Sequence, residues 1–337
     1  NTVNKTWIIQ NSAGYQVTIS QGTGANVVIP NGGIKMVVAD GAGAGAAVTD
    51  VLDMTGGTGN IGLGSGSLGT AITTGTDNVA IGEAALDAVT SGSNNTAVGD
   101  NALGANTTAD NNTAVGSSAL LVNTTGSENT AVGQGALDAN TTAAGNTAVG
   151  SDSLTANTTG ASNTGLGKNA LAANTTASNN VAVGRDALTA NTTGTDNVAV
   201  GSNAADANTT GNDNTAIGDN ALGANTTASN NTAVGSSALL VNTTASDNTS
   251  VGAGSMDATT TGSYNSAVGS EALGANTTGT SNVAVGVSSL AANTTASNNT
   301  AVGRDALLSN TTGAENVAVG TNALDAQTTG GSYNTAV

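Results

Sequence analysis

The side chains of this chain that could do chemistry are carboxylates, hydroxyls and amides. The 337 residues include no histidine and no cysteine. The commonest general base and the thiolate ligands of metal sites are therefore both missing. Only 8% of the residues are charged, with 22 acidic and five basic side chains. Catalysis or binding would have to come from the acids, from the repeated Asn-Thr-Thr segments or from glycine-rich segments.

The acidic residues do not form a regular constellation. Hydrolysis of a glycosidic bond needs two carboxylates at a set separation, and calcium-binding β-rolls need Asp at regular intervals after Gly. Here Asp87, Asp100, Asp110 and Glu128 fall at different points of a repeated pattern. We interpret them as solvating charge, and we predict no enzyme activity, no metal site and no cofactor.

The Asn-Thr-Thr and Gly-x-Gly segments each have a functional and a structural interpretation. Asn-Thr-Thr matches the glycosylation sequon, but we favour a turn whose polar side chains stack. Its threonines resemble the hydroxyl rows of ice-binding solenoids, although adjacent residues are expected to point different ways. Gly62-Leu63-Gly64 lies outside any strand-to-helix unit, so nucleotide binding is not supported.

All these residues belong to one seventeen-residue repeat. It reads Asn, Thr or Val, Ala, Val or Ile, Gly, two variable positions, Ala-Leu, one variable position, Ala-Asn-Thr-Thr, Gly or Ala, and two variable positions. A fixed period indicates one structural unit stacked on itself. It argues against the disorder that such a low-complexity composition would otherwise suggest. The opening Asn is at 78, 95, 112, 129, 146, 163, 180, 197, 214, 231, 248, 265, 282, 299 and 316.

Within one copy the sequence predicts β-structure and turns. Thr96–Val98 is expected to be a short strand with β-branched residues on one face and Ala on the other. Gly99 would end it, and a second strand would carry Ala102–Leu103. Asn106–Thr108 has turn chemistry. A helix over Ala-Leu-x-Ala would be too short to be stable. The steps of eighteen residues, from Asn60 to Asn78 and from Asn316 to Asn334, would be bulges or cap adjustments.

Three columns of the repeat are predicted to have structural roles. An unvarying Gly implies positive φ or a backbone too close for a Cβ. The Leu column supplies the core, and the Asn that precedes Thr-Thr suits a left-handed or Asx turn. Stacked Asn side chains could also form amide ladders. The first members are Gly82, Gly99, Gly116, Gly133 and Gly150, then Leu86, Leu103, Leu120 and Leu137, then Asn106, Asn123 and Asn140.

The small core of each coil favours self-association. One Leu, one Val or Ile and about three Ala contribute only a few kcal/mol per coil, whereas ordering costs roughly 1–2 kcal/mol per residue. A thin roll that packs against copies of itself fits this balance. We expect the Ala column after the first strand (Ala80, Ala97, Ala114, Ala131) to be the contact face of a homotrimer.

The sequence divides into three parts and predicts an all-β protein. Residues 1–55 form a small β-module, residues 56–77 a transition with a first degenerate coil, and residues 78–337 a parallel β-roll or β-solenoid of about fifteen coils. In the module, residues 41–47 would be a connection, and Val48–Met54 a short helix or strand. Its expected strands are Thr6–Ile9, Tyr15–Ile19, Asn26–Ile29 and Ile34–Val38.

Two resemblances suggest a fibre. Asn-Thr-Ala-Val-Gly followed by Ala-Leu-x-Ala, over residues 60–337, resembles the head repeats of trimeric autotransporter adhesins, which stack as left-handed parallel β-rolls with three chains to a fibre. This repeat is three residues longer than that family's usual unit. In the module, Asn-Ser-Ala-Gly-Tyr, Gly-Thr-Gly, Ile-Pro-Asn-Gly and Ala-Asp-Gly resemble a small β-module of bacteriophage tail fibres.

These resemblances imply the shaft of a phage tail fibre in the virion, which projects a receptor-binding tip toward the host surface. Its partners would be two further copies of itself, other tail proteins on the N-terminal side, and a host receptor or glycan bound by a distal region. The alternatives are a bacterial trimeric surface adhesin and, third, an ice-binding solenoid. A net charge of −17 disfavours nucleic acid and anionic lipid, and no segment predicts membrane insertion. The last copy stops part-way, so we expect the chain to be a piece of a longer polypeptide.

Overall fold

The computed structural model describes residues 5–20, 26–29, 34–39, 48–54, 59–69, 72–328 and 330–337. The chain divides into two compact units, Asn1–Thr159 and Gly160–Val337. The predicted boundaries at residues 55 and 77 stay predictions, and the connection expected at 41–47 lies outside the described residues. Together the units contain a parallel β-solenoid of about sixteen turns, with about seventeen residues per turn. This confirms the predicted fold class; the trimer stays a prediction.

The first unit begins with two small antiparallel sheets. The strands β1 (Lys5–Gln10), β4 (Ile34–Ala39) and β5 (Val48–Met54) pair in the order β1-β4-β5, while β2 (Val17–Ile19) pairs with β3 (Val27–Ile29). The four predicted strands are confirmed, and residues 48–54 form a strand rather than a helix. Val27, Ile29 and Val37 form the buried cluster of this module, against which Ile9 and Ile19 pack.

The rest of the first unit consists of stacked coils. Each coil contributes one three-residue strand, which pairs in parallel with the strand of the next coil so that identical columns lie side by side. Thr96, Ala97 and Val98, for example, lie opposite Thr113, Ala114 and Val115. The strands are β6 (Ile61–Leu63), β7 (Val79–Ile81), β8 (Thr96–Val98), β9 (Thr113–Val115), β10 (Thr130–Val132) and β11 (Thr147–Val149).

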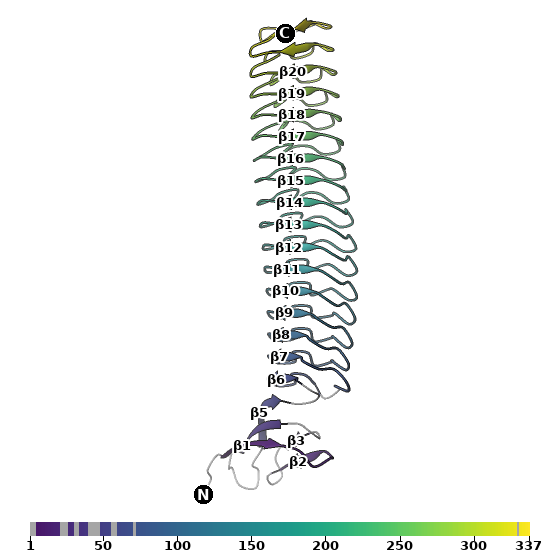
Figure 1. The fold of residues 1–337 in the computed structure, drawn as a ribbon, viewed down its shortest axis with the longest axis vertical. Coiled ribbons are helices and arrows are strands. Elements are labelled where there is room, and N and C mark those ends of the chain that lie inside the picture. The colour runs from purple at the N-terminus through teal and green to yellow at the C-terminus, as the bar shows by residue number, and fades with distance from the viewer. Residues whose placement is uncertain are drawn as a thin grey trace. The chain divides into compact units, whose positions relative to one another are not determined.

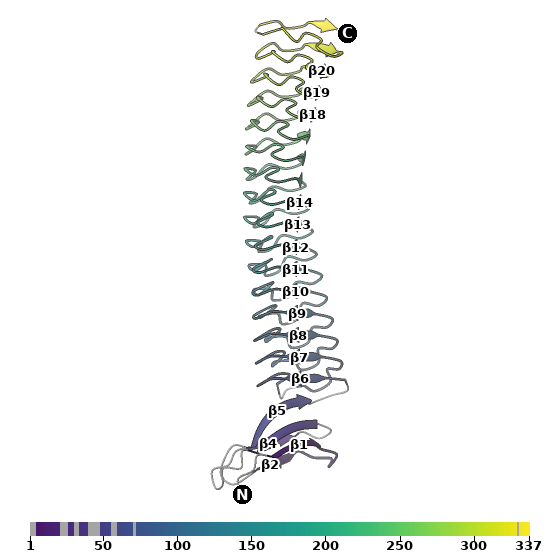
Figure 2. The same cartoon turned by 90° about the vertical axis from the view of Figure 1, so that its left-hand side faces the viewer.

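The second unit is built from the same coils alone. Its strands stack in chain order within the unit, as Figure 1 and the turned view of Figure 2 show. Every pair again matches residues one repeat apart. The strands are β12 (Thr164–Leu166), β13 (Val181–Val183), β14 (Val198–Val200), β15 (Thr215–Ile217), β16 (Thr232–Val234), β17 (Thr249–Val251), β18 (Ser266–Val268), β19 (Val283–Val285), β20 (Thr300–Val302), β21 (Val317–Val319) and β22 (Thr335–Ala336).

The segment after each strand is a chain of turns, so the predicted second strand around Ala102–Leu103 is wrong. The Ala102 N–H donates to the Gly99 carbonyl at 3.3 Å, and the Asn106 N–H to the Leu103 carbonyl at 3.1 Å. Positive φ at the third residue is typical of some tight turns. Asn101 has φ of 56° in the turn from Gly99 to Ala102, and Leu103 has φ of 52° in the overlapping turn that the Gly104 N–H closes on the Asn101 carbonyl at 3.2 Å. The turns still bond from coil to coil, because the Leu103 N–H donates to the Ala119 carbonyl at 3.0 Å.

The Ala column of the strands faces the inside of the coil, so its predicted role as a subunit contact is also wrong. Ala80, Ala97, Ala114 and Ala131 are all fully buried within a single chain. The residues that flank them in the strand are half-buried or exposed. A coil this narrow has room only for a methyl group at the middle of the strand, and the larger β-branched side chains therefore point outward.

Candidate functional site

The side chains of the Leu column fill the apolar part of the coil, although the backbone at these residues has an unfavourable conformation. Leu86, Leu103, Leu120 and Leu137 are fully buried, with φ between 52° and 53°. Positive φ costs a non-glycine residue on the order of 1–3 kcal/mol. Burial of a Leu side chain contributes about 1.5–3 kcal/mol, which offsets this cost. The column thus combines a turn-forming backbone with the main apolar side chain of the coil.

The Gly column is required for two separate reasons. At Gly99 φ is 137°, in a region that other residues rarely adopt and only with strain. A Cβ at Gly99 would also lie 2.5 Å from the carbonyl oxygen of Gly116 in the next coil. The other predicted members, Gly82, Gly116, Gly133 and Gly150, have φ of 133–142°. Each of these glycines lets the chain leave the strand and pass close to the coil stacked on it.

The Asn that opens each coil forms a buried amide ladder, as expected for stacked Asn side chains. Its side chain is fully buried at Asn95. The Asn95 Nδ2 donates to Asn78 Oδ1 at 3.1 Å and to the Ala109 carbonyl at 2.9 Å. The Asn95 Oδ1 accepts from the backbone N–H and from Nδ2 of Asn112, at 3.0 and 3.2 Å. All four hydrogen bonds of the amide are therefore made. We call this column the first ladder.

The Asn before Thr-Thr forms a second ladder rather than the predicted left-handed or Asx turn. Asn106, Asn123 and Asn140 are fully buried, and none of them has positive φ. The Asn123 Nδ2 donates to Asn106 Oδ1 at 3.3 Å and to the Gly126 carbonyl at 2.9 Å. Because these amides are enclosed and bonded, they cannot be reached by a glycosylating enzyme in the folded chain. The asparagines with left-handed backbone instead occupy variable positions, as at Asn101 and Asn111.

In many coils the two ladders meet at one carbonyl group. In the coil that begins at Asn95, the Ala109 carbonyl accepts from Asn95 Nδ2 at 2.9 Å and from Asn106 Nδ2 at 3.1 Å. The bonds tie the strand side of the coil to its turn side. A core that is polar along two columns can be stable in this way, because the buried amide donors of Asn95 and Asn106 both find acceptors.

The threonine pair behaves differently at its two positions. The hydroxyl of Thr107 donates to the Thr124 carbonyl of the next coil at 3.2 Å, and Thr124 repeats the bond to Thr141 at 3.1 Å. Thr108, by contrast, is exposed. The first threonine row of the pair is therefore used for coil stacking, and only the second row of the pair faces solvent.

A further column has a role that the sequence pattern left unassigned. At the variable position that directly follows the Gly or Ala after Thr-Thr, a side-chain oxygen accepts a hydrogen bond from a backbone N–H of the preceding coil. Ser127 Oγ accepts from the Asp110 N–H at 3.1 Å, and Asn212 Oδ1 from the Thr195 N–H at 2.7 Å. The signal was present, because most copies have Ser, Thr, Asn or Asp at this position. These side chains satisfy backbone groups that the strand does not reach.

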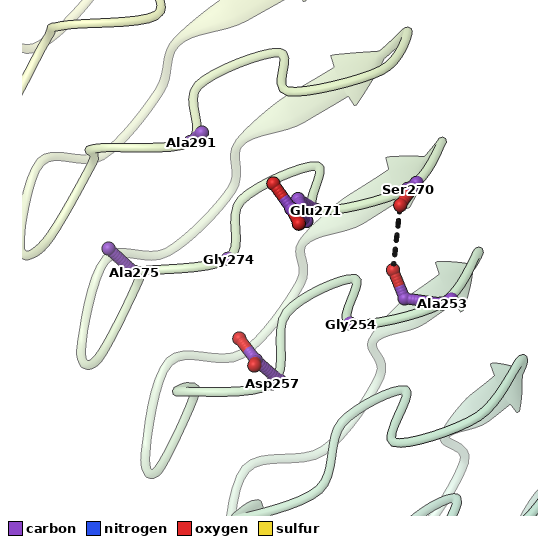
Figure 3. Close-up of a pocket in the computed structure, with 8 residues that line it drawn as sticks. All are labelled: Ala253, Gly254, Asp257, Ser270, Glu271, Gly274, Ala275 and Ala291. Atoms are coloured by element: carbon purple, nitrogen blue, oxygen red, sulfur yellow. Dashed lines mark hydrogen bonds between the residues drawn. The ribbon is translucent and has the colours of Figure 1, made fainter.

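In the repeats the acidic residues lie on the outside, with a shallow pocket beside two of them (Figure 3). It has a volume of about 440 Å³ and lies beside Asp257 and Glu271, where Gly254 and Gly274 leave space. Burial raises the pKa of the Asp257 carboxyl, and the Glu271 charge raises it further, against backbone hydrogen bonds that lower it. The Ser270 hydroxyl on the rim donates to the Ala253 carbonyl at 3.3 Å. The pocket lining holds two carboxylates but no cation and no aromatic ring.

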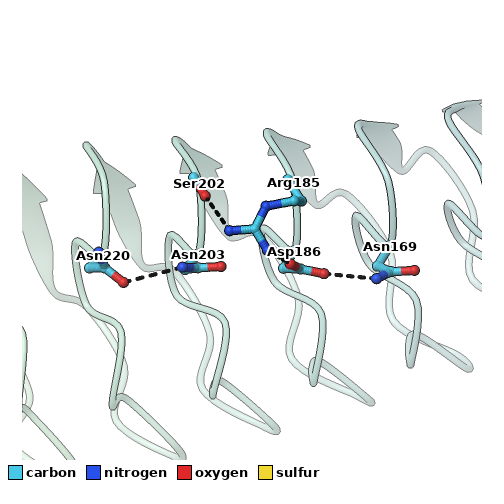
Figure 4. Close-up of polar contacts among 6 residues, drawn as sticks. All are labelled: Asn169, Arg185, Asp186, Ser202, Asn203 and Asn220. Atoms are coloured by element: carbon cyan, nitrogen blue, oxygen red, sulfur yellow. Dashed lines mark hydrogen bonds and ion pairs between the residues drawn. The ribbon is translucent and has the colours of Figure 1, made fainter.

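Polar side chains also bond along the outer surface of the second unit (Figure 4). Asn169 Nδ2 donates to Asp186 Oδ1 at 2.8 Å, and Asn203 Nδ2 to Asn220 Oδ1 at 3.4 Å. Arg185 pairs with Asp186 and also donates to Ser202 Oγ at 3.1 Å. Exposed pairs of this kind contribute little to stability, so we assign them to the solvated surface.

Among the described residues there is no group of three or more acidic, His or Cys side chains that could hold a metal ion. The same part of the chain contains no helix of the length and hydropathy needed to cross a membrane. Comparisons of the sequence and structure with known protein families, with curated proteins and with solved structures find no match.

Proposed function

We propose that this chain is the shaft of a bacteriophage tail fibre, in which three copies assemble and hold a receptor-binding region at a distance from the virion. The observation that carries the proposal is the pair of buried Asn ladders. Each rung is complete only when the same residue lies in the coils on either side, as at Asn78, Asn95 and Asn112. Each coil is therefore stabilised by identical coils on both sides in the same chain, and such a repeat is suited to building a long shaft.

The distribution of variable residues supports a mechanical role. Columns that face the inside are nearly invariant, whereas the charged residues of the repeats fall at the outer variable positions. A binding or catalytic site would instead need one coil with a distinctive set of polar side chains. We therefore assign no catalytic residue, metal or cofactor to the repeats. Recognition of a host receptor or glycan would belong to another region of the fibre, and attachment to other tail proteins to the N-terminal side.

Two other functions make different predictions. A bacterial trimeric adhesin would share the coil but be found on the cell surface. An ice-binding solenoid would need regular rows of free hydroxyls. Of the threonine pair only the row of Thr108 remains, because the hydroxyl of Thr107 is already donated to a carbonyl group. The second alternative is therefore the weaker one.

Immunogold electron microscopy with an antibody against the repeats tests the proposal. We expect label on fibres of purified virions and none on uninfected host cells. Label on the bacterial surface and none on virions would contradict the phage-fibre proposal and support the bacterial adhesin. A thermal-hysteresis assay on the purified chain, expected to be negative, tests the ice-binding alternative.

A further inference from the structure

The outward side of the strands is an uncharged and largely apolar surface. In the second unit, the first and third residues of strands β12 to β21 point away from the coil, and we call these residues the outer strand face. The first residues are Thr, Val or Ser, and the third are Val, Ile or Leu. Many of the third side chains are exposed, including Leu166, Ile217, Val268, Val285 and Val319. Leu166 is 45% and Val268 42% exposed.

The outer strand face is as large as the largest apolar patches that soluble monomers expose, and such patches are often functional. Ten three-residue strands, about 4.8 Å apart and about 10 Å long, cover roughly 500 Å². Soluble monomers rarely expose a larger continuous apolar patch, and patches of this size commonly mark an interface. The face is also free of bulky polar side chains, so another surface can approach it closely.

The charge distribution favours this face over the others. The chain carries a net charge of −17, which repels other copies. In the second unit, the acidic side chains lie in the turns, at residues such as Asp213, Asp247 and Glu315, and none lies in the outer strand face. Two copies can therefore approach through this face without placing carboxylates opposite each other.

From these observations we propose that the outer strand face binds the same face of further copies of this chain. The inference rests on the proposed function, because it names the surface through which three copies of the shaft would assemble. A second copy is the partner that fits, since its ridges of Val and Ile have the same spacing from coil to coil. The buried Ala column that the sequence suggested for this contact cannot serve, because Ala182 and Ala199 are already enclosed in their own coil.

Charged substitutions on the outer strand face test this assignment. In the full chain, Val268→Lys, Val285→Glu and Val302→Lys place alternating charges on three neighbouring strands, β18 to β20. The matched control places the same charges at exposed positions of the same coils, Thr278→Lys, Thr295→Glu and Thr312→Lys. Sedimentation equilibrium should give three times the 31.7 kDa chain mass for the parent and the control. The face variant should show a threefold lower mass, with an unchanged far-ultraviolet circular dichroism spectrum.

The outcomes separate the two proposals. A trimeric parent whose mass is unaffected by the face variant would overturn the outer strand face as the contact but leave the trimer intact. A parent of single-chain mass would overturn both. If the face variant loses its circular dichroism spectrum, it has failed to fold, and cross-linking then tests the face instead. The parent chain has no cysteine, so any disulfide must form at an introduced cysteine. Val285→Cys chains should then form disulfide-linked dimers under mild oxidation while Thr295→Cys chains do not, and equal cross-linking of the two would also overturn the face.

Discussion

Two coils of the second unit show which features of the repeat tolerate change. The coil that begins at Asn214 follows the common pattern, whereas the coil that begins at Asn248 has Ser250, Ser255, Met256 and Thr259 in place of Ala, Ala, Leu and Asn. Their backbones agree nonetheless. Met256 has φ of 52°, close to the 53° of Leu222, and each N–H donates to the next coil at 3.0 Å. The backbone path is therefore independent of these four side chains.

The side chains of the two coils differ in how well their polar groups are satisfied. Ser250 Oγ donates to the Ser255 carbonyl at 2.8 Å, so an added hydroxyl is accommodated in the core. Thr259, however, interrupts the second ladder, and both Thr259 Oγ1 and Asn242 Oδ1 are buried without a hydrogen-bond partner. Whether a residue is tolerated at a ladder position depends on which residue occupies that position in the neighbouring coil. At the other core positions it depends only on the volume of the side chain and on a nearby hydrogen-bond acceptor.

Breaking the apolar column of the regular coil should have the largest effect. Leu222→Asp places a carboxylate at a fully buried position, where no cation compensates for the lost hydration. We expect a loss of about 4 kcal/mol or more in the free energy of unfolding. Thermal denaturation followed by circular dichroism checks this. Thr227→Asp, at an exposed position of the same coil, should change the melting temperature little. Equal melting temperatures of the two variants would contradict the burial of Leu222 inside the coil.

A Cβ in the glycine column should cost less, and the cost should depend on the neighbouring coil. At Gly235, φ is 138° and a Cβ would lie 2.5 Å from the Gly252 carbonyl oxygen. At Gly320, φ is 130° but the nearest contact is the Ala323 Cβ at 4.0 Å. We expect Gly235→Ala to lose about 3 kcal/mol and Gly320→Ala only the backbone cost of about 1–2 kcal/mol. Hydrogen exchange at the substituted coil measures each loss, and equal losses would mean that close stacking is not what excludes a side chain.

Restoring the second ladder in the degenerate coil should stabilise the chain. Thr259→Asn supplies a donor for Asn242 Oδ1, and we expect a gain of about 1–2 kcal/mol. Thr261→Asn, at the exposed position two residues on, is the control and should have no effect. Conversely, Asn225→Thr should weaken the regular coil, because it removes the bond from Asn225 Nδ2 to Asn208 Oδ1 at 2.8 Å. Chemical denaturation measures all three, and a destabilised Thr259→Asn chain would count against the ladder.

The smallest expected effect concerns the carboxylate of the degenerate coil. Because burial raises the pKa of Asp257 in the folded chain above 3.8, its contribution to stability is fully present below pH 3.8 and is lost as the pH rises through the folded pKa. Asp257→Asn should therefore melt slightly higher than the parent at neutral pH, and this difference should vanish in acid. Asp247→Asn removes the same charge from an exposed position where other copies have Asn. If it raised the melting temperature equally, relief of overall negative charge would be the explanation.

Sequence reasoning was most successful for the invariant Gly column and for the Asn residues that stack on one another. An invariant Gly implies positive φ or close approach, and both occur at Gly99. Stacked Asn residues predicted an amide ladder, and the structure contains two. The reasoning failed for Asn106, because Asn suits a turn as well as a buried ladder, and only the surroundings decide between them. It failed for Leu103 as well, since a Leu with positive φ contradicts its ordinary preference.

The sequence alone determined the period and the register of the coils, because only one alignment places Asn on Asn, Leu on Leu and Gly on Gly in every turn. It also showed that the two sides of each strand differ. Which side faces inward was decided by the tertiary structure. The turns around Gly99 and Leu103 set the width of the coil, and that width admits Ala97 but leaves Val98 outside. The width depends on how the whole coil closes. The alternation of side chains along a three-residue strand contains no information about it.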